Sequence, residues 1–504
     1  MMKKSYKVQS LGTGVQSKSE MRKGTKHVLS TDTTKFSGGT DKNPEPVYML
    51  LSSLSGCLTA TTDYVAKNLD EPVPIMSMDI SIEAWRDQRE VIKKPITDPE
   101  VSTALKEIRG KVQLRLPRRS ALPPERLEEL SSTVENRCPI SALLTSSSCL
   151  VELDWSVLPS PKKVNIYGGG LAGLSTSYWL LNSDPDLDIT IHSASSPGTS
   201  GGTSVAGGFF HPYTPKGKSP ARNVLDYDIT RSMIDRCREL NENVVKTDVI
   251  YKAALEEKHV ESLGNTGCEI MGEEEFYDVT KCRAKGGGVK LDKGLVLDPK
   301  AYCEALLEVC KGMIAEGRTL EYKIGEVDFD KITKPQGEDA VNVFCGGGDM
   351  LYSERFKSLD CQPIVGRSLK FQNEEGVDFG IICGKYVSPI GGSLIVGATN
   401  EVEGERYLNS DSEVFESIKA KAENLRPDLF NGKEYEVTKG VRANPKRTNN
   451  GRIPIVEYLG EREFVFTGLG SRGFLTHGRY GRSCARLILG DADDDEMDND
   501  DVVI

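Results

Sequence analysis

The chain has 504 residues, a length that predicts two or more domains. Its net charge is −11, and a run of eight acidic residues within 491–501 contributes much of it, which argues against tight, nonspecific nucleic-acid binding. No stretch approaches the ~20 apolar residues of a membrane span, no secretory signal begins the chain, and the twelve cysteines include no C-x-x-C pair. We therefore expect a cytoplasmic protein with reduced thiols and no membrane partner, and the basic N-terminus leaves organelle targeting open.

The N-terminal third mixes two kinds of apolar periodicity. Residues 76–82, 112–116 and 151–157 alternate with period two, which predicts half-buried strands of an antiparallel sheet. The apolar run 48–69 predicts a largely buried helix, and 125–136 predicts a second helix after a Pro-Pro pair. This region therefore reads as an α+β domain.

Two cysteines of this region stand at notable positions. Cys57 lies in the first predicted helix, and Cys138 directly precedes Pro139. Because proline favours the first helical position, Cys138 is expected to cap a helix, whose dipole would lower the pKa of its thiol. Spacing alone favours the alternative that both are inert core cysteines.

The sequence PVYMLLSSLSGC ending at Cys57, and RCPI around Cys138, resemble the OsmC/Ohr family of thiol peroxidases across roughly 5–157. The resemblance implies that Cys57 attacks a peroxide and that Cys138 resolves it as a disulfide. It also implies a positioning arginine, for which Arg22 is the match, and a homodimer formed through this domain.

One departure from that family pattern is visible. The family's usual acid falls at Val47 or Tyr48, and neither can fix an arginine by charge. The domain is therefore either an active peroxidase or mainly a dimerisation module.

A joint rich in proline and serine, SVLPSPKK, follows this region. It predicts a domain boundary, so we assign an OsmC-like domain to 1–157, a linker to 158–162 and a second domain to 163–490. The acidic residues 491–504 are expected to form a disordered tail.

The second domain begins with a glycine motif that lies between a predicted strand and a predicted helix. Gly168, Gly170 and Gly173 stand in G-x-G-x-x-G order between an apolar strand, 164–167, and an apolar helix, 174–181. These glycines permit a tight turn, close approach of a pyrophosphate and close helix packing, so the segment predicts dinucleotide binding.

The next elements complete a doubly wound pattern. A strand over 188–192 ends at Ser193, which stands where an acid normally binds the ribose hydroxyls. A further strand is expected at 339–345 and a final helix at 475–489. The order predicts an α/β, Rossmann-type domain.

Three later segments favour a flavin over a nicotinamide. They are SGGTSVAGGFFHPYT (200–214), YVSPIGGSLIVGATNE (386–401) and GLGSRGF (468–474). Small residues in them would let backbone N–H groups approach the cofactor. The cofactor-binding candidates in these segments are Thr203, Ser204, Gly470, Arg472 and Gly473.

Together the segments resemble the D-amino-acid oxidase/glycine oxidase superfamily across about 162–490. The similarity is strongest to the FAD domain of the bacterial enzyme that matures carboxymethylaminomethyl-uridine at tRNA wobble positions. The resemblance implies noncovalent FAD, an antiparallel-sheet substrate subdomain and oxidation of a carbon next to an amine. No metal site is assigned.

The resemblance also singles out substrate residues. The family's arginine in a G-x-R motif corresponds to Arg442, whose guanidinium would bind a substrate carboxylate through two parallel bonds. A surface salt bridge is the alternative role. His211 would either touch the flavin or be a buried, hydrogen-bonded histidine, and Arg367 stands where the family often has glutamine.

Three functions fit these observations. The first is an FAD-dependent oxidoreductase acting on a C–N bond of a small amino acid or N-carboxymethyl amine, with a possible second thiol peroxidase activity. The second is an oxidase that modifies a tRNA wobble uridine. The third is a non-catalytic scaffold with degenerate OsmC-like and flavin domains. The substrate and the electron acceptor stay open.

Overall fold

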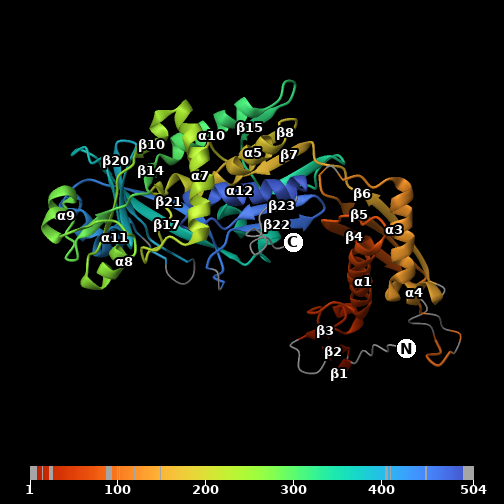
Figure 1. Cartoon of the computed structure of the whole chain (residues 1–504). Coiled ribbons are helices and arrows are strands. Elements are labelled where there is room, and N and C mark those ends of the chain that lie inside the picture. The colour runs from red at the N-terminus through yellow and green to blue at the C-terminus, as the bar shows by residue number, and fades with distance from the viewer. Residues whose placement is uncertain are drawn as a thin grey trace. The chain divides into compact units, whose positions relative to one another are not determined.

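The computed structural model describes residues 8–491 apart from 14, 22–26, 87–93, 99, 101–102, 119, 148, 403–406, 409 and 449–450. Arg22 and the acidic residues beyond 491 lie outside the described residues. The chain divides into two compact units, Met1–Pro159 and Ser160–Ile504 (Figure 1). No helix among the described residues is long and apolar enough to cross a membrane.

In its described residues, the first unit contains two three-stranded sheets and the helices α1, α3 and α4. One sheet consists of β1 (Val8–Thr13), β2 (Gln16–Met21) and β3 (Val28–Thr31). The other consists of β4 (Ser77–Trp85), β5 (Glu107–Arg115) and β6 (Leu150–Val157). The helices are α1 (Pro46–Asn68), α3 (Pro124–Arg137) and α4 (Pro139–Ser146).

Two expectations for this unit are wrong in detail. The strand β5 pairs antiparallel with β4 but parallel with β6, because α3 and α4 form a crossover between β5 and β6. Alternating apolar residues fix the faces of a strand but not its direction. The helix α1 buries only one stripe, and Tyr48 and Tyr64 on it are 65% and 59% exposed.

The second unit is built on a six-stranded sheet of order β15-β8-β7-β16-β23-β22. All neighbours pair parallel except β22 with β23. The strands are β7 (Lys163–Tyr167), β8 (Asp188–Ser193), β15 (Leu320–Ile324), β16 (Ala340–Phe344), β22 (Ile455–Gly460) and β23 (Glu463–Thr467). This is the Rossmann-type arrangement that the sequence predicts.

Four helices pack together in this part of the second unit (Figure 1). They are α5 (Leu171–Ser183), α7 (Ala221–Leu240), α10 (Pro299–Met313) and α12 (Gly473–Leu489). The helix α5 is buried on most sides because its sequence is apolar or small almost throughout. Close contact with α12 is possible because Gly481 faces Ser175, and a Cβ there would lie 2.6 Å from Ser175 Oγ.

The second sheet of this unit has eight strands in the order β12-β13-β11-β18-β19-β20-β17-β21. It is antiparallel, as expected, except that β11 and β18 pair parallel. The strands are β11 (Ile250–Ala253), β12 (Ile270–Met271), β13 (Gly288–Lys290), β17 (Cys361–Gln372), β18 (Gly380–Cys383), β19 (Lys385–Ile390), β20 (Ser393–Gly397) and β21 (Glu436–Pro445).

Shorter elements surround the eight-stranded sheet. A small sheet is formed by β9 (Phe209–Phe210), β10 (Val245–Thr247) and β14 (Leu295–Leu297). The helices are α6 (Gly201–Ser204), α8 (Val260–Gly264), α9 (Glu273–Thr280) and α11 (Asp411–Ala422). Val414 and Ile418 of α11 pack with Leu369, Val387 and Val396 of the sheet, so α11 covers one of its faces.

Candidate active site

The glycine motif forms the turn between β7 and α5. Gly168 has φ +127°, and a Cβ on it would lie 2.3 Å from the Cys345 carbonyl oxygen. A Cβ on Gly173 would lie 1.9 Å from the Gly168 carbonyl oxygen, so neither position accepts a side chain. A Cβ on Gly170 would meet only the Thr203 hydroxyl, at 3.2 Å. The first N–H groups of α5 lack partners within the helix, so this turn can hold an anionic phosphate.

The start of α12 lies beside the start of α5. Gly473 begins α12, and a Cβ on it would lie 3.5 Å from Leu171 Cδ1 at the first residue of α5. Gly470 has φ +56°, and its N–H donates to the Ala443 carbonyl at 2.9 Å, which ties this loop to β21. Two helix N-termini therefore meet next to the strand that carries Arg442.

The short helix α6 joins the glycine turn to the eight-stranded sheet. Thr203 on α6 faces Gly170, and Ser204 Oγ donates to the Gly201 carbonyl at 3.1 Å. A Cβ on Gly202 would lie 3.3 Å from Arg442 Cγ, and one on Gly440 would lie 2.5 Å from the Gly201 carbonyl. The glycines on both sides therefore allow backbone to pack directly on backbone.

Ser193 is buried at the end of β8, next to the glycine turn. Its Oγ accepts a long hydrogen bond from the Ser195 N–H, at 3.5 Å. Sequence reasoning missed Tyr322, whose hydroxyl donates to the Ser195 carbonyl at 2.9 Å and lies where a Cβ on Gly169 would be. Tyr322 comes from β15, so only the folded sheet brings it to this turn.

Arg442 lies half-buried on β21, across the backbone of Gly366. Its Nη2 donates to the Thr399 carbonyl at 3.2 Å and to Asn400 Oδ1 at 3.3 Å. Burial lowers the pKa of its guanidinium. No carboxylate of the described residues forms an ion pair with Arg442. The alternative role as a surface salt bridge therefore finds no partner in the described part of the chain.

Arg367 is bound differently from Arg442, although both lie in the same sheet. Its guanidinium forms a buried ion pair with Glu401, with Nη2 to Oε2 at 3.5 Å, and lies over the ring of Tyr407. Arg367 is therefore a neutralised, internal group rather than an open contact for a ligand.

Sequence reasoning also missed the contacts of Tyr386 and Lys385, the first two residues of β19. The hydroxyls of Tyr386 and Ser368 lie 3.2 Å apart, and the Tyr386 ring packs where a Cβ on Gly207 would be. The ammonium of Lys385 donates to the Ala398 carbonyl. Tyr386 is the first residue of the expected flavin segment 386–401, and Lys385 precedes it, so the two side chains lie on opposite faces of β19.

His211 directly follows β9. Its Nδ1 is buried and has no hydrogen-bond partner in the part of the chain that the structure describes. Burial, together with nearby Arg472 and Lys252, lowers the pKa of His211 to about 3, so its ring is neutral at neutral pH. Arg472 Nη2 donates to the carbonyls of His211 and Tyr213, at 3.2 and 3.0 Å. Arg472 thus holds the backbone of residues 211–213 in place. The contact of Arg472 with a cofactor stays a prediction.

Cys57 and Cys138 of the first unit are neighbours. Cys57 is half-buried on α1, and Cys138 is fully buried and caps α4, its Sγ accepting from the Ser141 N–H at 3.4 Å. The cap is as expected, but the expected lower pKa is wrong. Burial, and then the neighbouring Cys57 thiol, raise the pKa of the Cys138 thiol, because desolvation outweighs the Ser141 and Ile140 N–H groups.

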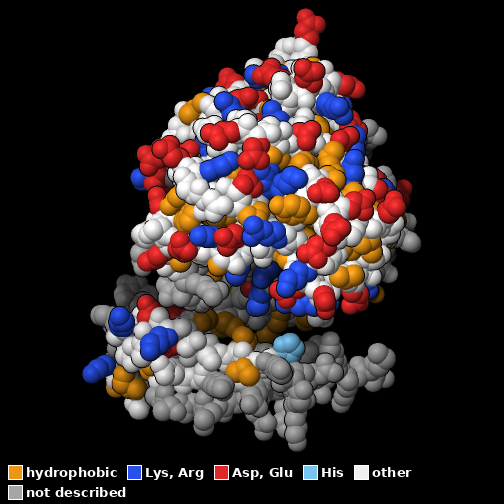
Figure 2. Space-filling model, turned by 90° about the vertical axis from the view of Figure 1, so that its left-hand side faces the viewer, with side chains coloured by type: hydrophobic (Ala, Val, Ile, Leu, Met, Phe, Trp, Pro, Cys, Tyr) orange, Lys and Arg blue, Asp and Glu red, His pale blue; other side chains and the backbone are white. Residues whose placement is uncertain are grey.

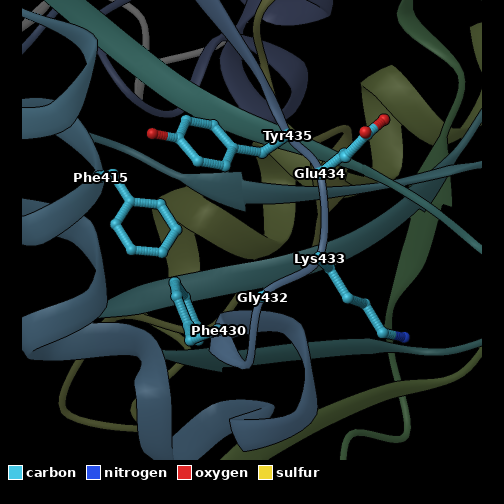
Figure 3. A pocket seen from close by; sticks show the side chains of 6 residues that line it. All are labelled: Phe415, Phe430, Gly432, Lys433, Glu434 and Tyr435. Atoms are coloured by element: carbon cyan, nitrogen blue, oxygen red, sulfur yellow. The ribbon is translucent and has the colours of Figure 1, made fainter.

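An open pocket of about 540 Å³ lies elsewhere on the second unit (Figure 3). Aromatic rings of Phe415, Phe430 and Tyr435 line it, and the side chains of Lys433 and Glu434 extend away from those rings (Figure 3). Phe415 belongs to α11, and none of the candidate site residues lines the pocket. We therefore place the candidate active site at Gly170, Thr203 and Arg442 and not at this pocket.

Comparisons with known proteins fit these two units. Residues 163–487, more than half of the chain, match the family model described as FAD dependent oxidoreductase. Residues 39–154 match the model described as OsmC-like protein. A search of curated proteins found no significant match.

Solved structures resemble the second unit in fold. Glycine oxidase from Geobacillus kaustophilus has a TM-score of 0.52 at 17% identity, covering 67% of this chain and 97% of its own. Iminodiacetate oxidase from Chelativorans sp. has a TM-score of 0.53 at 14% identity, covering 67% and 98%. L-proline dehydrogenase from P. horikoshii has a TM-score of 0.51 at 13% identity, covering 66% and 94%.

Proposed function

We propose that this chain, which belongs to the family of FAD-dependent oxidoreductases, oxidises the C–N bond of a small amine that carries a carboxylate. The proposal depends on one observation: the guanidinium of Arg442 is half-buried and has no carboxylate partner among the described residues. It lies on the strand that packs against α6, and α6 contacts the glycine turn.

The residues present fit FAD. Gly170 offers a position without a side chain, and the N-termini of α5 and α12 meet beside it, which suits an anionic pyrophosphate. FAD, when bound, supplies the electron acceptor for oxidation of the substrate carbon. No cysteine lies in segment 200–214, so we expect the cofactor to be noncovalent.

The chain's own residues bind and orient the substrate. Arg442 would hold the substrate carboxylate through two parallel bonds, and the backbone of Thr399 and the side chain of Asn400 hold the guanidinium in place. His211 presents a neutral ring, so the positive charge comes from Arg442 and not from His211. The Tyr386 hydroxyl lies beside Ser368 as a further donor.

The test is the spectrum of the purified protein. We expect a yellow protein whose colour is released into the supernatant by acid precipitation. Anaerobic addition of glycine, N-methylglycine or iminodiacetate should bleach the visible absorbance, and the corresponding methyl esters should not. A colourless protein that FAD does not reconstitute would contradict the proposal.

A tRNA substrate is the second candidate, since the similarity to a tRNA-modifying domain suggested it. Binding to tRNA requires a broad basic surface and a strong dependence on salt. On the face of the second unit seen in Figure 2, acidic and basic side chains are interspersed rather than segregated. This observation favours the small amine, and a salt-independent failure to bind tRNA would exclude the second candidate.

For the first unit, an OsmC-like domain, we propose thiol peroxidase activity. Cys57 would attack a peroxide oxygen as thiolate, forming a sulfenic acid and releasing water or an alcohol. Cys138 would then attack the Cys57 sulfur, forming a disulfide and releasing water, and a dithiol would reduce the disulfide. The raised pKa of Cys138 supports its role as the second and not the first nucleophile.

A further inference from the structure

The two residues of β9 pack in opposite directions. The ring of Phe210 stacks on Tyr227 of α7, with ring centroids 4.5 Å apart. The ring of Phe209 packs against Tyr386 of the eight-stranded sheet, with centroids 5.5 Å apart. Because side chains alternate along an extended chain, the next residue, His211, returns to the side of Phe209 and faces the eight-stranded sheet.

Two cationic side chains hold the segment 211–215 on that sheet. Arg472 Nη2 donates to the carbonyls of His211 and Tyr213, and Lys252 Nζ donates to the Pro215 carbonyl at 2.9 Å. Arg472 directly precedes α12, and Lys252 lies on β11. The segment is therefore fixed both to the start of α12 and to the sheet.

The face of the sheet that meets this segment is the face of the candidate substrate site. Strand register places Lys252 on the same face as Tyr386 and Arg442. The connecting pairs are Lys252 with Ile382, Ile382 with Tyr386, Tyr386 with Gly397, Gly397 with Ser368, and Ser368 with Thr438, four residues from Arg442. His211 thus lies between the start of α12 and the face that carries Arg442.

His211 and His477 differ in how their buried ring nitrogens are hydrogen-bonded. His477 Nδ1 lies 2.9 Å from the Gly473 carbonyl, and its Nε2 lies 2.8 Å from the Tyr302 hydroxyl. His211 Nδ1 is also buried, but no described residue offers it a hydrogen bond of acceptable geometry. A buried polar atom without a partner costs free energy, so its retention calls for a bound ligand.

The surroundings of His211 indicate the chemistry of that ligand. Burial, then Arg472 and Lys252, lower the pKa of the ring, and the Tyr213 backbone opposes them with the smallest effect, so the ring is neutral. The two cations disfavour an ammonium group at this place, and a substrate carboxylate is assigned to Arg442. A neutral imidazole suits a neutral N–H or carbonyl partner, and the edge of an isoalloxazine ring offers both.

We infer that His211 Nδ1 forms a hydrogen bond with the isoalloxazine ring of bound FAD and fixes this ring against the segment 211–215. The inference rests on the proposed function, in which FAD is the cofactor of the second unit. Because Arg472 and Lys252 hold the backbone of the segment, the imidazole is positioned before the cofactor binds.

Titration of the full-length apoprotein with FAD tests the inference without turnover. His211→Phe keeps a ring and removes both nitrogens, so the dissociation constant for FAD should rise about 3- to 10-fold, as expected for one hydrogen bond. The visible absorbance maxima of bound FAD should shift in this variant, because the polarity at the flavin ring changes. His211→Asn places an amide near the position of Nδ1 and should restore much of the affinity.

The stability of the apoprotein separates a ligand contact from a structural contact. His211→Phe should leave the Tm of the apoprotein unchanged or raise it, because an apolar ring replaces a buried polar atom that has no partner. FAD should then raise the Tm less in His211→Phe than in wild type. His259→Phe is the matched control, because His259 belongs to the same unit and lies in a separate short helix, Glu257–His259.

Three results would overturn the inference. The first is an unchanged dissociation constant and spectrum of FAD in His211→Phe. The second is a lower Tm of the apoprotein with an unchanged effect of FAD, which would make the contact structural. The third is weaker binding of (methylthio)acetate alone, an unreactive analogue with a thioether in place of the amine, which would assign Nδ1 to the substrate.

The failure of the proposed function gives a different result. If wild type binds FAD and oxidises carboxylated amines, the proposed function stands whatever the His211 variants show. If wild type binds no FAD, the proposed function fails and the inference fails with it.

Discussion

Gly170 faces the hydroxyl of Thr203 across the start of α5, and a Cβ on Gly170 would lie 3.2 Å from Thr203 Oγ1 and near nothing else within 4 Å. Gly173, one helical turn further on, has no such room, since its Cβ would lie 1.9 Å from a carbonyl oxygen. Gly170 thus leaves space beside the N-terminus of α5, and Gly173 permits close packing of the helix. The two roles can be separated by mutation.

We predict that Gly170→Val abolishes FAD binding and leaves the fold intact. The added methyl groups would fill the space that a pyrophosphate needs, and they meet no backbone of the protein. The ratio of visible to ultraviolet absorbance measures the cofactor, and thermal unfolding of the apoprotein measures the fold. Gly312→Val is the control, because Gly312 lies in α10, away from the glycine turn, with no atom within 4 Å of its Cβ position. A stoichiometric amount of FAD in Gly170→Val would contradict the assignment.

We predict that Arg442→Ala lowers kcat/KM for carboxylated amines and leaves FAD binding unchanged. The loss should correspond to roughly 2–5 kcal/mol, by analogy with truncation of one partner of a buried charge pair. The Tm should change little, because no described carboxylate is left unpaired. Arg442→Lys should recover only part of the activity, since lysine lacks the planar fork.

The control for this prediction is Arg318→Ala, which removes an arginine paired with Asp188 at 3.5 Å on the other sheet. Steady-state kinetics with glycine and N-methylglycine measure the effect. The role of Arg442 is excluded if Arg442→Ala turns over these substrates as fast as wild type.

Local sequence was enough to predict the glycine turn and its flanking elements. Positive φ at Gly168 and close packing at Gly173 are requirements that only glycine meets, so the motif with its apolar flanks predicts β7 and α5. The cap at Cys138 was predictable for the same reason, because Pro139 has a strong positional preference.

Features that depend on distant residues were not predictable. The parallel pairing of β6 with β5 depends on the path of α3 and α4, and the pKa of Cys138 depends on how deeply α4 is buried. The hydrogen bond from Lys385 to the Ala398 carbonyl gave no signal in the sequence, because it depends on the pairing of β19 with β20. The sequence motifs therefore predicted part of the candidate site, and the tertiary structure revealed the remaining contacts.

We predict that the free energy of unfolding falls in mild acid and that His477 causes much of this fall. Its Nδ1 lies 2.9 Å from the Gly473 carbonyl, its Nε2 lies 2.8 Å from the Tyr302 hydroxyl, and burial lowers its pKa to about 4. The pKa of His477 is about 4 in the folded state and roughly 6.5 in the unfolded state, so folding favours the neutral ring. Its contribution to the free energy of unfolding is therefore complete above pH ~6.5 and is lost as the pH falls through about 4. The expected contribution is on the order of 3 kcal/mol.

Chemical denaturation at pH 7, 5.5 and 4 measures this effect. His477→Gln keeps a donor and an acceptor but cannot titrate, so its stability should fall less between pH 6.5 and 4 than that of wild type. His259→Gln is the control, because His259 lies in a short surface helix. Parallel losses in wild type and His477→Gln would assign the acid sensitivity to other groups.

The last prediction concerns hydrogen peroxide as a product of the second unit and a substrate of the first. If oxygen is the electron acceptor, we predict that the second unit reduces it to hydrogen peroxide and that Cys57 and Cys138 of the first unit consume that peroxide. A shared chain raises the local concentration of peroxide near the thiols, although a small, fast-diffusing product gains less from a tether than a bound partner does.

The measurement is free peroxide during amine turnover, with and without a dithiol reductant. Wild type should release less peroxide when dithiol is present, because each disulfide must be reduced before the next cycle. Cys57→Ser should release the full amount at the same rate of amine oxidation, since the attacking sulfur is absent. Without dithiol, Cys138→Ser should consume one equivalent of peroxide and stop as the sulfenic acid of Cys57. Cys149→Ser, which changes another buried thiol of the same unit, should behave as wild type. If Cys57→Ser and wild type release equal peroxide at equal amine turnover, the first unit is not a scavenger, and dimerisation becomes the better explanation for its presence.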